Sequence, residues 1–211
     1  MCRVTVLLVD TPSVPARAHV HEVGAPRGLL VLGHGAGGGV TSRDLAATAA
    51  LATSEGVSVV LVEQPYRVAG RRSPPPAPRL DAAWTAVVDS LRARWGWELP
   101  LVVGGRSSGA RVACRTAAAT GASGVLCLAF PLQPPQGKRL EPRPSRLPEL
   151  DGVTVPTLVV QGERDAFGIP PPSAYRMVVL VPGDHGLRAG LDPATPVIRD
   201  WLQRLVTSGL P

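Results

Sequence analysis

The stretch LPLVVGGRSSGARVACRTAAA, residues 99–119, joins an apolar strand-like run to a run of small helix-forming residues through a glycine-rich turn. Within it, Gly105-Arg106-Ser107-Ser108-Gly109 matches the pattern G-x-S-x-G, in which a serine occupies a sharp strand-to-helix turn. Such a turn crowds the residues two before and two after the serine, so glycine is favoured at Gly105 and Gly109. The stretch predicts Ser107 as a nucleophile; the alternative is a plain glycine turn.

Apolar strand-like runs alternate with helical runs on both sides of this stretch. Continuous apolar strands indicate a largely parallel sheet covered on both faces, that is, an α/β fold in one domain over residues 1–211. The Pro- and Arg-rich residues 131–150 look irregular, and we expect at most a partial lid there. The predicted strands are 3–9, 17–23, 28–33, 57–62, 99–103, 124–129, 155–161 and 177–181, with helices near 43–54, 80–95, 108–119 and 193–205. The first two strands suit an antiparallel edge hairpin.

A serine nucleophile needs a base and an acid that orients the base. In this type of fold the chain order is serine, acid, histidine, and of the four histidines only His185 follows the last strand. Its alternative is a surface loop histidine. For the acid we favour Asp165, just after strand 155–161, over Glu163 and Asp184. Asp184 adjoins His185 and would reach its far ring nitrogen with difficulty.

Two backbone N–H groups are needed to bind a developing oxyanion. One is expected from Ser108, directly after the nucleophile, and the other from the turn after strand 28–33, most simply from Ala36. Gly35 and Gly37 flank Ala36 and let the backbone approach a ligand closely. A phosphate cradle is the alternative, but the turn lacks the Lys-Ser/Thr ending of a P-loop.

The composition argues against several other classes of function. The net charge is +6, yet the basic residues are scattered, with two groups in Pro-rich loops and no interleaved aromatics, so we expect no nucleic-acid binding. No apolar run is long enough for a membrane span. The three cysteines, Cys2, Cys114 and Cys127, lack metal-ligand spacing, so we expect no metal and a reducing, cytoplasmic setting.

Several motifs together resemble one family. LVLGHGAGGG, GGRSSGAR, FPLQPP, PTLVVQGERDAFG and PGDHG are similar to the small α/β-hydrolases typified by the testis-expressed and KAT8-regulatory-complex proteins, and more loosely to dienelactone hydrolases. The resemblance implies an α/β-hydrolase fold with Ser107, Asp165 and His185 as nucleophile, acid and base, and an oxyanion role for residues 34–37. Dienelactone hydrolases use a cysteine nucleophile instead, and relatives often carry a histidine where this chain has Gln133.

These observations predict a serine hydrolase acting on an ester or thioester of a small acyl group, without a cofactor. The expected partner is the small-molecule substrate, and the sequence leaves the oligomeric state open. A non-catalytic binding module and an acyltransferase with the same residues remain as alternatives.

Overall fold

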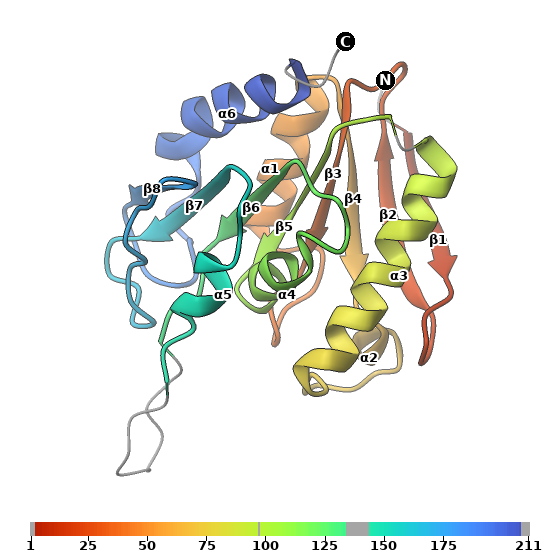
Figure 1. Cartoon of the computed structure of the whole chain (residues 1–211), viewed down its shortest axis with the longest axis horizontal. Helices are drawn as coiled ribbons and strands as arrows, with labels where there is room; N and C mark the ends of the chain where they lie inside the picture. Colours follow the sequence, from red (N-terminus) through yellow and green to blue (C-terminus); the bar gives the residue numbers. More distant parts are fainter. Residues whose placement is uncertain (1–2, 97, 134–143, 208–211) are drawn as a thin grey trace.

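The computed structural model describes residues 3–96, 98–133 and 144–207. Its strands form one eight-stranded sheet in the order β1-β2-β4-β3-β5-β6-β7-β8 (Figure 1). The pairs β1–β2 and β2–β4 are antiparallel and the others are parallel. The strands are β1 Arg3–Val9, β2 Ala16–Glu22, β3 Gly28–Gly33, β4 Val57–Glu63, β5 Leu101–Arg106, β6 Gly124–Leu128, β7 Thr157–Gly162 and β8 Arg176–Val181. The predicted α/β fold, with its antiparallel edge hairpin, is confirmed.

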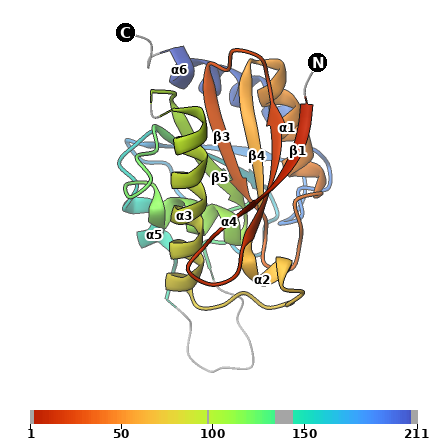
Figure 2. The same ribbon diagram turned by 90° about the vertical axis from the view of Figure 1, so that its right-hand side faces the viewer.

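Helices cover both faces of the sheet, as Figure 2 shows edge-on. Helices α3 and α4 pack on one face, and α1 and α6 pack on the other, each over its own apolar core. Every residue of β3, β6 and β7 is buried, which is why these strands are mostly apolar in sequence. The helices are α1 Arg43–Ser54, α2 Pro65–Val68, α3 Ala77–Trp95, α4 Ser108–Thr116, α5 Leu147–Asp151 and α6 Thr195–Thr207, with a 3-10 turn at Asp192–Ala194.

The structure differs from the sequence expectation in the short elements. Residues 131–150 are not wholly irregular, because α5 begins at Leu147, where Leu150 is buried in the core. Helix α2 was not predicted, since four residues give no periodicity to detect. The last helix is preceded by a 3-10 turn at Asp192–Ala194. Residues 134–143, the middle of the proposed lid, lie outside the described residues.

The sequence also predicted that the chain has no membrane-spanning helix and no metal site. Among the described residues, no helix is long and apolar enough to cross a membrane. In the same ranges, no group of three His, Cys, Asp or Glu side chains is placed to hold a metal ion. Cys114 and Cys127 are free and buried, their sulfur atoms 3.6 Å apart, as expected for small core residues.

Candidate active site

The predicted elbow joins β5 to α4, and Ser107 sits at its apex. Its backbone has φ 51° and ψ −107°, a left-handed conformation that costs energy for a residue with a Cβ. The Ser107 N–H donates to the Leu128 carbonyl of the neighbouring strand at 2.9 Å, which holds the strained residue in place. The serine side chain therefore projects from the carboxyl end of the sheet.

The two elbow glycines lie against β3. A Cβ atom added at Gly105 or at Gly109 would stand 2.3 Å from the Gly33 carbonyl oxygen, closer than any real contact. Gly105 also has φ +155°. The pattern G-x-S-x-G is thus required here by the close approach of β5 and α4 to Gly33.

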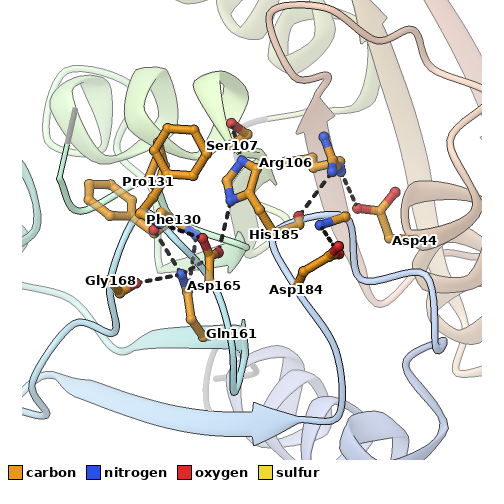
Figure 3. A network of polar contacts seen from close by, with 12 residues as sticks. Asp44, Arg106, Ser107, Phe130, Pro131, Gln161, Asp165, Gly168, Asp184 and His185 are labelled. Atoms are coloured by element: carbon orange, nitrogen blue, oxygen red, sulfur yellow. Dashed lines mark hydrogen bonds and ion pairs between the residues drawn. The ribbon is translucent and has the colours of Figure 1, made fainter. Parts of the chain in front are cut away.

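Ser107, His185 and Asp165 lie together, although 78 residues separate the first two in sequence (Figure 3). His185 Nε2 is 2.9 Å from Ser107 Oγ, and His185 Nδ1 is 2.8 Å from Asp165 Oδ2. The Asp165 side chain is fully buried, whereas the imidazole is 20% exposed. The imidazole therefore bridges a buried carboxylate and a hydroxyl at the sheet edge, which is the arrangement that general-base activation of a serine needs.

The buried Asp165 carboxylate has several hydrogen-bond donors. Its Oδ1 accepts from the Phe167 N–H at 2.9 Å, and its Oδ2 accepts from Gln161 Nε2 at 2.8 Å as well as facing the imidazole. The Gln161 amide is itself fixed, because its Oε1 accepts from the Phe130 N–H at 2.9 Å. These donors compensate for the loss of water around the carboxylate and fix its orientation.

The two competing acids lie elsewhere. Glu163 is exposed, and the carboxylate that pairs with the His185 ring is that of Asp165. Asp184 Oδ1 accepts from the Gly186 N–H at 2.8 Å, so it closes the turn that carries the histidine. The structure thus pairs the imidazole with Asp165, the residue favoured from sequence.

Arg106, at the first unspecified position of G-x-S-x-G, joins three parts of the site (Figure 3). Its Nη2 donates to the His185 carbonyl at 3.0 Å, and its Nε forms an ion pair with Asp44 Oδ2 at 2.8 Å. Asp44 is almost fully buried at the start of α1. Because the guanidinium is planar, the two contacts together fix its orientation. The hydrogen bond to the His185 carbonyl therefore also holds the loop that carries His185 in place.

The glycine-rich turn lies beside the nucleophile. A Cβ placed at Gly35 would be 3.6 Å from Ser107 Cβ and 3.0 Å from Arg106 Nη1, so the backbone passes close to the elbow there. The Ala36 carbonyl accepts from Tyr66 Oη at 3.0 Å, which orients the Ala36–Gly37 peptide. A Cβ at Gly37 would meet no atom of the described residues within 4 Å, so of these two glycines only Gly35 is crowded by its described neighbours.

The His34 side chain holds this turn through two hydrogen bonds. Its Nε2 accepts from the Gln64 N–H at 3.1 Å, so Nδ1 carries the proton and donates to the Gly35 carbonyl at 2.8 Å. Burial is the main cause that lowers the pKa of His34, and the nearby positive charge of Arg67 lowers it further. The backbone hydrogen bond to Gly35 acts in the opposite direction but does not outweigh burial. The ring is therefore a neutral support for the turn at physiological pH.

Sequence reasoning missed four contributors: Gln161, Phe167, Arg106 and Asp44. Phe167 packs its ring 4.3 Å, centroid to centroid, from the His185 ring. Gln161 carried a detectable signal, because it is the polar residue near the end of an otherwise apolar buried strand. Arg106 and Asp44 gave none, since their pairing depends on how α1 packs beside the elbow. Gln133, which departs from the family pattern, bonds through its backbone N–H to Phe167.

Comparison with known proteins gives a consistent result. Residues 26–190 match the model of the alpha/beta hydrolase domain family. XC6422 from Xanthomonas campestris, an α/β serine hydrolase without a lid, is 19% identical over 96% of this chain and 94% of that one, with a TM-score of 0.75. Est1E from Butyrivibrio proteoclasticus has a TM-score of 0.76 at 16% identity, covering 96% and 99% of the two chains.

A dienelactone hydrolase from Anabaena variabilis has a TM-score of 0.74 at 16% identity, covering 97% of this chain and 98% of that one. At these identities the likeness shows the fold alone. No curated protein matches this chain in sequence.

Proposed function

Because the chain belongs to the alpha/beta hydrolase domain family, we propose that it is a serine hydrolase cleaving a carboxylic ester or thioester of a small acyl group. The observation that carries the proposal is the hydrogen-bonded row Ser107–His185–Asp165, with contacts of 2.9 and 2.8 Å. The motifs FPLQPP and PGDHG further support a narrower kinship with the testis-expressed and KAT8-regulatory-complex proteins.

In the proposed reaction, Ser107 Oγ attacks the acyl carbonyl while His185 Nε2 takes the serine proton. Asp165 stabilises the resulting imidazolium and keeps Nδ1 protonated. The imidazolium then gives its proton to the departing alcohol or thiol, which leaves an acyl-enzyme. Water, deprotonated by the same imidazole, attacks the acyl-enzyme and releases the acid.

The oxyanion formed in each step would be bound by the backbone N–H groups of Ala36 and Ser108. The first N–H groups of α4 have no carbonyl partner within the helix, so that of Ser108 is free to donate. The Ala36 N–H belongs to the Gly35–Ala36 peptide, whose carbonyl accepts from His34 Nδ1 at 2.8 Å, and Gly35 lies close to Ser107. No atom of the described residues lies within 4 Å of a Cβ at Gly37, which would leave room for the substrate beside it.

A fluorophosphonate probe tests the nucleophile directly. We expect covalent labelling of the wild-type protein at Ser107, detected by mass spectrometry of the labelled peptide, and none in Ser107→Ala. Ser123→Ala, a serine beyond the opposite end of β5, is a control that should label normally. A folded wild-type protein that fails to react would overturn the proposal.

The acyl preference is tested with p-nitrophenyl esters and thioesters of increasing chain length. We expect kcat/KM to be highest for the short acyl groups. The same assay with an added alcohol or amine tests for acyl transfer. If the transfer product formed in preference to the free acid, the assigned reaction would be acyl transfer and not hydrolysis.

A further inference from the structure

Phe167 contacts two members of the row Ser107–His185–Asp165 at once. Its ring centroid lies 4.3 Å from that of the His185 imidazole, with 46° between the two ring planes. Its backbone N–H donates to Asp165 Oδ1 at 2.9 Å. We propose that Phe167 is a positioning residue, whose ring keeps the imidazole in its working orientation once Ser107 is acylated. This inference rests on the proposed function and adds a residue to it.

The backbone of Phe167 is fixed by hydrogen bonds on both sides. Its carbonyl accepts from the Gln133 N–H at 2.7 Å, which ties it to the segment after β6. The next residue, Gly168, donates its N–H to the Asp165 carbonyl at 2.9 Å and accepts at its own carbonyl from Gln161 Nε2 at 2.9 Å (Figure 3). Because the backbone is held at these points and the side chain is partly buried, the ring offers a fixed surface to the imidazole.

The His185 imidazole needs such a surface. The torsion that turns an imidazole ring about its bond to Cβ has a broad energy minimum, so packing and hydrogen bonds must set the angle of the ring. In the free enzyme one hydrogen bond joins Nδ1 to Asp165 and another joins Nε2 to Ser107. Arg106 holds the backbone carbonyl of His185 and leaves the ring torsion free. The side chain is 20% exposed, so water competes for the ring nitrogens.

Acylation removes one of the two hydrogen bonds that hold the ring. Ser107 Oγ becomes the ester oxygen of the acyl-enzyme and has no proton to donate to His185 Nε2. The imidazole is then held by its hydrogen bond to Asp165 and by its contact with the Phe167 ring. The second half of the reaction therefore depends more on Phe167 than the first half does.

That second half is the attack of water on the acyl-enzyme. The water oxygen bonds to the acyl carbon while His185 Nε2 takes a proton from the water. The bond between the acyl carbon and Ser107 Oγ then breaks, and Nε2 gives the proton to Oγ, which releases the free acid. An imidazole that has turned away cannot reach the water, so loss of the Phe167 ring should slow this step selectively.

The test is Phe167→Ala, which removes the ring and keeps the backbone N–H that donates to Asp165. With a p-nitrophenyl ester the leaving group departs readily, so kcat reports release of the acyl group and kcat/KM reports its transfer to Ser107. We expect kcat to fall about tenfold while kcat/KM changes by less than about twofold. Acyl-enzyme should accumulate on Ser107 in the variant, detected by mass spectrometry of the acid-quenched protein.

Two further variants serve as controls. Phe167→Tyr keeps an aromatic ring and should have the kcat of the wild-type protein. Ile169→Ala changes an exposed side chain of the same loop and should leave both constants unchanged. Circular dichroism verifies the fold, and Phe167→Leu, for which we expect the same direction of change, takes the place of the alanine variant if that variant does not fold.

Fluorophosphonate labelling of Ser107 separates the two ways in which this inference can fail. A folded wild-type protein that is neither labelled nor active would overturn the proposed function and this inference with it. If the wild-type protein is labelled and active, an unchanged kcat in Phe167→Ala would overturn this inference alone. Equal falls in kcat and kcat/KM would do the same, since they would mean that the ring supports the site as a whole.

Discussion

The Arg106 guanidinium donates to the carbonyl oxygen of His185 at 3.0 Å while it pairs with the buried carboxylate of Asp44. The residue next to the proposed nucleophile therefore holds the loop that carries the proposed base. The nucleophile and base are joined twice, once by the hydroxyl–imidazole contact and once through this guanidinium.

Arg106→Met should lower kcat about tenfold or more with little change in KM, because the histidine loop loses its anchor while the substrate-binding surface is kept. The variant also leaves Asp44 buried without its partner, which costs about 3–5 kcal/mol of stability. The double variant Arg106→Met/Asp44→Asn removes that charge. It should regain thermal stability but not kcat; recovery of both would mean that Arg106 only stabilises the fold.

Asp165→Asn should reduce kcat about 10⁴-fold, since the amide cannot stabilise the imidazolium and favours the wrong tautomer of His185. Gln161→Leu should have a smaller effect on kcat, because it removes one of the donors to Asp165 without removing the charge. Steady-state kinetics on a p-nitrophenyl ester, with fold verified by circular dichroism, measures both. If Asp184→Asn proved as damaging as Asp165→Asn, the assignment of the acid would be wrong.

Gly109→Ala should prevent folding or lower the melting temperature severely, because the new Cβ would stand 2.3 Å from the Gly33 carbonyl oxygen. Gly37→Ala is the matched control in the other glycine-rich turn. Its Cβ would meet no atom within 4 Å in the part of the chain that the structure describes, so the melting temperature should change by only a few degrees. Equal melting temperatures for the two variants would contradict the packing described here.

Stability should depend on pH through His34. Burial lowers its pKa in the folded state below the value near 6.5 of the unfolded chain. The unfolded chain therefore binds more protons as the pH falls through about 6.5. The contribution of neutral His34 to the free energy of unfolding is fully present above about pH 6.5. Below that pH it decreases by up to about 1.4 kcal/mol per pH unit.

His34→Gln keeps an acceptor for the Gln64 N–H and cannot titrate. Its free energy of unfolding, measured with urea between pH 5 and pH 8, should fall less steeply on acidification than that of the wild-type protein. His21, whose pKa is also lowered, mainly by burial, contributes the same sign in both proteins and cancels in the comparison. Identical slopes would show that His34 is not held neutral.

The sequence by itself determined the features that are local or periodic. Unbroken apolar runs predicted the buried parallel strands, and the glycines around Ser107 predicted the turn because only they tolerate the approach of Gly33. The order serine, acid, histidine selected His185, and the position just after strand 155–161 favoured Asp165 over Glu163 and Asp184. Parallel strands bring their carboxyl ends, and with them these residues, to one edge of the sheet.

Only the tertiary structure decided the contacts between side chains distant in the chain. The pairing of Arg106 with Asp44 depends on how α1 packs beside the elbow, and the donors around Asp165 depend on the loops after β6 and β7. The cavity that Val14, Tyr66 and Leu80 line is likewise formed by three segments that no local pattern relates. Local patterns fix which residues form an element, but the distances between elements follow from packing of the whole core, which no short stretch encodes.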